Sequence, residues 1–156
     1  MTDFREVLGR FPSGVTVVTA FEAGVPVGFT CQAFSSLSLR PPMVVLAPSK
    51  NSTSWPRMIE AGEFCVNILT DEQQEVSDAF AERGANKFEG VSWHVGAAGT
   101  PVLDGSLAWV ECALDAVHDA GDHELVTGRV LELGVGEGSP LVFYRSEYRK
   151  LRRITG

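Results

Sequence analysis

Runs of apolar and β-branched residues, separated by turn-forming residues, dominate the chain and predict mainly β structure. The segments expected as strands are residues 14–20, 25–30, 43–47, 63–69, 107–117, 124–133 and 141–144. Residues 22–24 are expected to turn the first two into a hairpin. In 107–117 the even positions are apolar, whereas Glu111 and Asp115 stand at odd positions. This alternation predicts an antiparallel strand with one face in solvent.

Helical spacing appears in residues 3–10, 53–61 and 71–83. The first of these begins at a Thr2 or Asp3 cap, and the third at a Thr70 or Asp71 cap. The apolar stripe of the first comprises Phe4, Val7, Leu8 and Phe11. The inner face of the third comprises Val76, Ala79 and Phe80, with Gly84 at its end. Short strands with helical insertions predict one domain over residues 1–156, built as a closed or nearly closed antiparallel barrel.

Charge is divided unevenly along the chain. The net charge is −7, but residues 1–144 carry −11 and residues 145–156 carry +4. An acidic body argues against nucleic acid as a partner, because phosphate neutralisation supplies most of that affinity. The basic end is expected to be a solvated tail, or else a contact for a phosphate or a protein partner. Since no apolar run approaches a membrane span or a signal peptide, we expect a cytoplasmic protein without a membrane partner.

Cysteine and histidine spacing argues against a metal site. Cys31, Cys65 and Cys112 are odd in number and widely spaced, so buried thiols in a reducing compartment are expected. The histidines form no paired metal-binding motif. A glycine-rich segment, residues 134–138, lacks a following helix and is expected to be a hairpin loop instead of a nucleotide loop.

Two polar segments carry the candidate chemistry. Residues 28–38 are rich in small and hydroxylated side chains and lie at the end of a predicted strand. Either these side chains satisfy the backbone groups of a turn, or the segment faces a planar polar ligand. Residues 48–55 place hydroxyl groups and Lys50 directly before a predicted helix. This second segment suits either helix capping or the binding of a phosphate.

These segments, with others in the same order, resemble the short-chain flavin reductases, the reductase components of two-component flavin-dependent monooxygenases. The stretches that carry the resemblance are residues 10–19, 27–39, 41–42, 49–55, 64–69, 86–88, 121–123 and 140–144. The Cys31-Gln32 pair is similar to that of the reductases that serve actinobacterial steroid-ring hydroxylases. The resemblance implies an FMN-binding split β-barrel with antiparallel Greek-key strands and peripheral helices, assembled as a homodimer.

The resemblance also implies the roles of individual residues. Flavin would be bound by Thr30, Cys31, Gln32, Ala33, Phe34, Ser35, Ser36, Ser49, Lys50, Asn51, Ser52, Trp55, Lys87 and Phe88. Among these, the backbone of 30–36 would hold the ring, and 49–52 with Lys87 would hold the phosphate. The nicotinamide would lie near His123, Tyr144 and Tyr148. Structural roles stay open for His123 as a strand-end histidine, and for Phe88, Tyr144 and Tyr148 as packing residues.

The implied activity is reduction of FMN or FAD by NADH or NADPH, followed by release of reduced flavin to a separate oxygenase. Because the cofactors carry the hydride chemistry, no side-chain acid or base is expected to be catalytic. Two other functions stay open: a flavin-binding split-barrel protein without turnover, and an oxidase acting on a B6 or haem-type ligand.

Overall fold

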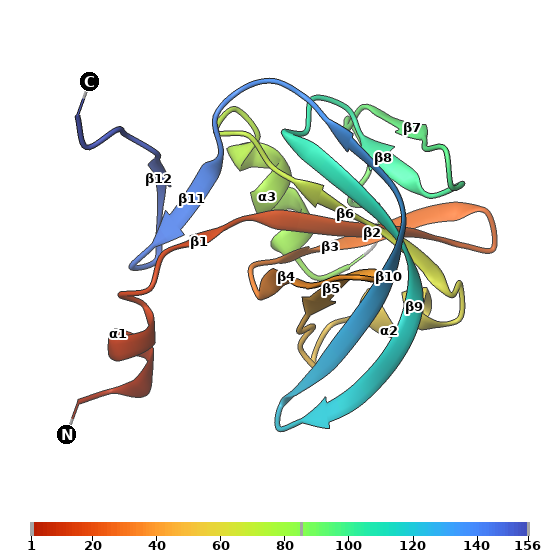
Figure 1. Cartoon of the computed structure of the whole chain (residues 1–156), viewed down its shortest axis with the longest axis horizontal. Helices are drawn as coiled ribbons and strands as arrows, with labels where there is room; N and C mark the ends of the chain where they lie inside the picture. The colour runs from red at the N-terminus through yellow and green to blue at the C-terminus, as the bar shows by residue number, and fades with distance from the viewer. Residues whose placement is uncertain (1, 85, 156) are drawn as a thin grey trace.

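The structure, a computed structural model, describes residues 2–84 and 86–155 and centres on a strongly curved antiparallel sheet (Figure 1). The sheet order is β3-β2-β6-β9-β10-β5-β4. Its strands are β2 (Thr16–Glu22), β3 (Val25–Cys31), β4 (Phe34–Leu39), β5 (Pro42–Leu46), β6 (Glu63–Ile68), β9 (Ala108–Ala120) and β10 (His123–Val135). The two edge strands, β3 and β4, are joined by Gln32 and Ala33 alone, so the sheet curls until its edges meet at one corner. This arrangement confirms the predicted split β-barrel.

The apolar runs of β2 and β6 are buried on both faces, because the sheet has a core on each side. The core inside the barrel includes Val18, Phe29, Leu46, Trp55, Phe64, Val66 and Cys112. The second core, outside the barrel, comprises Val15, Val17, Leu69, Phe80, Leu103 and Leu141. Burial of this kind stabilises the fold by about 25 cal/mol for each Å² of apolar surface removed from water.

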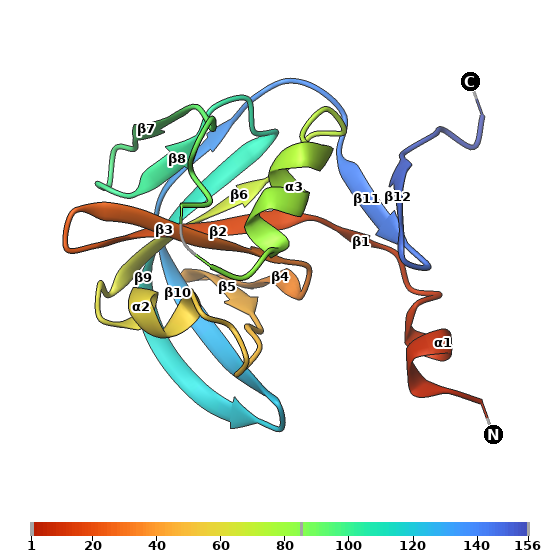
Figure 2. The ribbon, with the colours of Figure 1, turned by 180° about the vertical axis from the view of Figure 1, so that it is seen from behind.

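Two short helices cover the barrel. The first, α2 (Trp55–Ile59), carries Pro56 in its first turn, as the sequence predicts. The second, α3 (Gln74–Ala81), packs Phe80 on the outer core, and Figure 2 shows this helix lying across β2 and β3. The predicted cap of this helix at Thr70 or Asp71 is wrong by a turn, because the Thr70 hydroxyl instead accepts from the Glu72 N–H at 3.3 Å.

An N-terminal segment and a C-terminal segment pair with each other and form an arm apart from the barrel. It consists of α1 (Phe4–Leu8) and the sheet of β1 (Ser13–Gly14), β11 (Leu141–Tyr144) and β12 (Glu147–Lys150). Asp3 caps α1, as predicted, by accepting from the Arg5 N–H at 3.3 Å. The apolar stripe of α1 does not face a core in this chain, since Phe4 is 75% exposed and Phe11 80% exposed.

The predicted solvent face of β9 is wrong at Glu111, which is 1% exposed. The hairpin of β7 (Trp93–Val95) and β8 (Pro101–Leu103) covers this position with its connecting loop. The loop approaches so closely that a Cβ on Gly96 would lie 2.4 Å from a Glu111 carboxylate oxygen. Asp115, further along the same face, is exposed as predicted.

The prediction of a hairpin loop at residues 134–138 is also wrong. Gly134 still belongs to β10, and the chain then crosses to β11, which pairs with β1 and β12 instead of β10. Glycine is required here by close packing, since a Cβ on Gly134 would lie 2.1 Å from the Trp109 ring. Within the described residues, no helix is long and apolar enough to cross a membrane.

Candidate functional site

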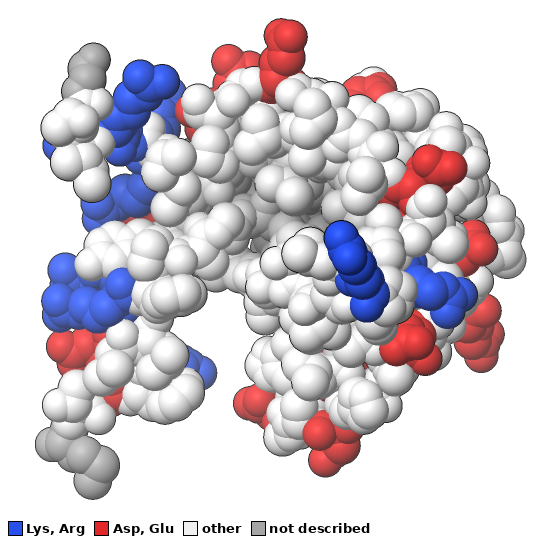
Figure 3. Space-filling view, viewed as in Figure 1, with Lys and Arg blue, Asp and Glu red and all other residues white. Residues whose placement is uncertain are grey.

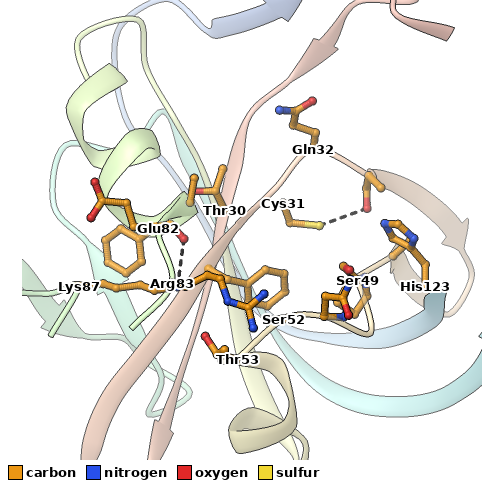
Figure 4. A pocket seen from close by; sticks show the side chains of 17 residues that line it. Thr30, Cys31, Gln32, Ser49, Ser52, Thr53, Glu82, Arg83, Lys87 and His123 are labelled. Carbon is orange, nitrogen blue, oxygen red and sulfur yellow. Dashed lines mark hydrogen bonds between the residues drawn. The ribbon is translucent and has the colours of Figure 1, made fainter. Parts of the chain in front are cut away.

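A cavity of about 450 Å³ lies at the corner where the barrel edges meet (Figure 4). One wall is the end of β3 and its link to β4, and the opposite wall is the loop of residues 47–53. The end of α3, Lys87 and His123 complete the lining. The cavity therefore joins a corner of extended backbone to a loop rich in hydroxyl groups.

Hydrogen bonds fix the backbone corner from several sides. The Thr30 hydroxyl donates to the Ser77 carbonyl at 2.7 Å, which ties β3 to α3. The Cys31 thiol donates to the Ala33 carbonyl at 3.5 Å, and the Ala47 N–H donates to the same carbonyl at 2.9 Å. Burial raises the pKa of Cys31 to about 11, so this thiol is neutral at pH 7.

The hydroxyl groups of the loop organise its own backbone. Ser49 Oγ accepts from the Asn51 N–H at 3.1 Å, and Ser52 Oγ accepts from the Trp55 N–H at 3.1 Å. The N-cap residue of α2 is Ser54, whose side chain makes no capping hydrogen bond, and Ser52 instead satisfies the first N–H of the helix. Binding of an anion by the same loop stays a prediction, because capping uses the hydroxyl lone pairs and leaves the hydroxyl proton available as a donor.

Lys87 links three elements of the cavity wall by hydrogen bonds. Its ammonium donates to the carbonyls of Gly28 at 3.3 Å and Phe80 at 3.2 Å, and to the Ser54 hydroxyl at 3.1 Å. Burial lowers the pKa of Lys87. With three protein acceptors in place, Lys87 joins β3, α3 and the start of α2 and adds positive potential to the cavity.

A second cation, Arg83, extends from the end of α3 over the cavity (Figure 4). Sequence reasoning missed this residue, because it stands between Glu82 and Gly84 at the end of a predicted helix and belongs to no motif. A guanidinium that lines a cavity beside hydroxyl groups suits a phosphate, which it can bind through two parallel N–H donors.

Lys50, the cation expected at the phosphate, does not line the cavity. It pairs with Asp119 at the end of the β9–β10 hairpin. Its neighbours Ser49 and Asn51 do line the cavity, so Lys50 is held on the outer side of the loop.

His123 lies at the rim of the cavity, where its backbone pairs with Ser49. Its Nδ1 lies 2.7 Å from a carboxylate oxygen of Asp122. The same hydrogen bond lowers the pKa of Asp122. This partner fixes the ring and leaves Nε2 as the nitrogen available to a ligand.

The structure gathers about half of the predicted site residues. Those that line the cavity are Thr30, Cys31, Gln32, Ala33, Ser49, Asn51, Ser52, Lys87 and His123. Those placed elsewhere are Phe34, Ser35, Ser36, Lys50, Trp55, Phe88, Tyr144 and Tyr148. The cavity is also lined by residues that were not among the predicted flavin-binding or nicotinamide-binding residues, among them Phe29, Ala47, Thr53, Phe80, Glu82 and Arg83.

Packing explains the residues that lie outside. Trp55 is 1% exposed in the barrel core, where its indole N–H donates to Glu124 at 3.2 Å. Phe88 packs edge-on against Phe80 with ring centroids 4.8 Å apart. Tyr148 ties the arm to α3, since its hydroxyl lies 2.7 Å from that of Ser77. In this chain, the side chains of Phe88 and Tyr148 therefore serve in packing.

The lining brings together no nucleophile with a base. Its thiol is neutral and bonded to a carbonyl, and its histidine pairs with an exposed carboxylate. Among the described residues, no group of three or more histidine, cysteine, aspartate or glutamate side chains could hold a metal ion. The hydroxyl groups and cations that line the cavity suit a polar ligand with an anionic group.

Comparison with known proteins identifies molecules with the same organisation. Residues 8–152 match the family model described as the flavin reductase like domain. The chain is 49% identical to the flavin-dependent monooxygenase reductase subunit HsaB of Rhodococcus jostii, with 93% of this chain and 75% of that protein covered.

Solved structures agree with the sequence match. Nitrilotriacetate monooxygenase component B from Mycobacterium thermoresistibile superposes with a TM-score of 0.92 at 47% identity, covering 96% of this chain and 85% of that one. The NADH:FAD oxidoreductase SgcE6 of Streptomyces globisporus, solved with NAD and FAD fragments, gives a TM-score of 0.91 at 30% identity, with 97% and 93% covered.

Proposed function

The chain belongs to the flavin reductase like domain family, and on this premise we propose that it reduces FMN or FAD with NADH or NADPH and supplies the reduced flavin to a separate monooxygenase. Its relative HsaB is a reductase subunit of a flavin-dependent monooxygenase, and its structural neighbour SgcE6 is an NADH:FAD oxidoreductase. The name of HsaB gives a monooxygenase as the partner, and the name of SgcE6 gives NADH and FAD as the reactants.

The observation that carries the proposal is the composition of the cavity from one end to the other. The β3–β4 link presents extended backbone beside the apolar side chains of Phe29 and Ala47, which suits a planar ring with polar edges. The loop of Ser49 to Thr53 and the guanidinium of Arg83 suit a phosphate. Flavin mononucleotide has this ring and this charge, so the residues present fit the group.

The residues of the chain position the reactants. When bound, the flavin accepts a hydride from the nicotinamide, and the protein supplies no acid or base for that transfer. The backbone at residues 30–33 orients the ring, and Arg83 with the serine loop anchors the phosphate. His123, at the rim, contacts the nicotinamide through Nε2. Positioning of two bound reactants is itself a large part of catalysis.

The same proposal includes a homodimer. The arm holds large exposed apolar side chains, and Figure 3 shows it standing apart from the acidic body, with Lys and Arg gathered on it. A second cavity of about 540 Å³ lies at the base of the arm. Gln32 and Ala33 line both this cavity and the first one, so a partner chain seated against the arm would adjoin the flavin site.

Steady-state kinetics test the proposed function. With NADH and added FMN or FAD, the protein is expected to oxidise NADH continuously, at a rate that depends on the flavin concentration. The alternative, a flavin-binding protein without turnover, predicts a tight stoichiometric yellow complex and no NADH oxidation above the uncatalysed rate.

A second experiment tests the supply of flavin by diffusion. The reductase and a flavin-dependent oxygenase are separated by a membrane permeable to flavin, with oxygen kept low on the reductase side. Hydroxylation of the oxygenase substrate is expected across the membrane. Product formed only on direct mixing would instead require a docked complex.

A further inference from the structure

Figure 1 shows the long β9–β10 hairpin, and backbone hydrogen bonds join its end to the loop that lines the cavity. The Glu124 N–H donates to the Pro48 carbonyl at 2.9 Å, and the Lys50 N–H donates to the Asp122 carbonyl at 3.0 Å. The Trp55 indole donates to the Glu124 carboxylate at 3.2 Å. The loop therefore takes its position from the hairpin, and charges on the hairpin end lie beside the loop.

The side chain of Lys50, in this loop, extends toward the hairpin. Its ammonium pairs with Asp119, and the two side chains are 44% and 81% exposed. Ser49 and Asn51, on either side of it, line the cavity. The backbone of Lys50 therefore belongs to the loop that forms the cavity wall, while its side chain pairs with a carboxylate outside the cavity.

The carboxylates around the hairpin end favour the outer position. Asp119 lies directly opposite Glu124 across the two strands, and Asp122 follows in the turn. Like charges that face each other across a strand pair are unfavourable. Lys50 relieves this repulsion while it pairs with Asp119, and the repulsion returns when Lys50 moves to another anion.

We propose that Asp119 sets the affinity for the flavin phosphate, by competing with the phosphate for Lys50. An exposed ion pair contributes little free energy, so Lys50 exchanges readily between the two anions. The competition weakens retention of any flavin phosphate. This inference rests on the proposed function. It accounts for release of the product by a reductase that binds phosphate, because Lys50 returns to Asp119 as the flavin leaves.

Titrations of FMN and riboflavin test the inference, because riboflavin has the ring without the phosphate. Wild type is compared with Asp119→Asn, Lys50→Ala and the double variant, using the quenching of flavin fluorescence. Asp119→Asn is expected to bind FMN about three- to tenfold more tightly and riboflavin within about twofold of wild type. Added salt should reduce the gain, since the freed lysine acts by charge.

Asp115→Asn is the matched control, because this substitution removes the same charge from the same hairpin. Asp115 does not pair with Lys50; its carboxylate accepts a hydrogen bond from the Thr127 hydroxyl at 2.8 Å. It should leave both affinities unchanged, and Lys50→Ala should abolish the gain in the double variant. An equal change for FMN and riboflavin, or a gain that survives Lys50→Ala, would overturn the inference. If wild type binds neither flavin, the proposed function itself fails.

Discussion

The carboxylate of Glu111 accepts from Thr100 twice, from its backbone N–H at 3.2 Å and from its hydroxyl at 2.7 Å. The Ala98 N–H donates to the same carboxylate at 3.1 Å. A buried carboxylate without a cation is tolerated here because donors from one loop surround it. The contact therefore holds the β7–β8 loop on the barrel.

Glu111→Gln is expected to lower the free energy of unfolding by about 2–4 kcal/mol, because the amide turns an N–H₂ group toward backbone donors. Urea unfolding followed by circular dichroism measures the change. The matched control is Glu132→Gln, at an exposed position of β10, which should cost little. Equal midpoints for the two variants would show that the buried carboxylate is not required.

Arg83→Ala is expected to weaken FMN by about tenfold while riboflavin changes little, since a charge-assisted contact with phosphate contributes roughly 1.5–3 kcal/mol. Fluorescence titration with both flavins measures this. Arg129→Ala removes an exposed arginine on β10 outside the cavity and serves as the control. A parallel loss for FMN and riboflavin would mean that Arg83 supports the ring or the fold.

His123→Ala is expected to raise the KM for NADH or to slow flavin reduction, with flavin affinity nearly unchanged. Anaerobic stopped-flow measurement of flavin reduction separates these effects. His118→Ala, an exposed histidine on the same hairpin, is the control. Normal kinetics accompanied by a lower unfolding midpoint would assign His123 a purely structural role.

The thiols of Cys31, Cys65 and Cys112 are buried and free, as the sequence predicts. Burial raises the pKa of Cys31 to about 11 and that of Cys112 to about 12. Because the thiolate is the reactive form, labelling by a disulfide reagent at pH 8 should be at least about a hundredfold slower than in urea. The labelling rate should rise with pH. Fast reaction of the folded protein would show that the cavity wall at Cys31 opens.

Phe11→Asp is expected to convert the proposed dimer into single chains of 16.8 kDa, because it places a charge in the apolar surface of the arm. Light scattering coupled to size-exclusion chromatography gives the mass. The control is Val95→Asp, which alters a similarly exposed apolar residue on the body. If wild type is already a single chain at micromolar concentration, the dimer proposal is wrong.

The strands with strong apolar patterns were predictable from the sequence, whereas β4 was not. Its residues Ser35, Ser36 and Ser38 are typical of a turn, and they form a strand because β5 offers them backbone partners. Pairing with a neighbour outweighs intrinsic preference in such segments.

The lining of the cavity was predictable in part from short segments, as at Ser49, Asn51 and Ser52. Arg83 and the true position of Lys50 were not, because each depends on a segment far away in the chain. Arg83 reaches the cavity only because α3 packs behind β3, and Lys50 leaves it only because Asp119 is adjacent. Glu111 shows the same limit, since alternation along β9 contains no information about the loop that covers it.

The pairing of β1 with β11 sets an order of events during synthesis. Ser13 and Gly14 pair with Phe143 and Val142, so the arm needs segments that precede and follow the barrel strands in the sequence. The strands of the barrel, by contrast, are complete once residue 135 has left the ribosome. A chain still being translated can therefore close its barrel while its N-terminal segment has no partner strand. The arm takes shape only once residues 141–150 have been made, so the proposed association of two chains through it would follow closure of the barrel.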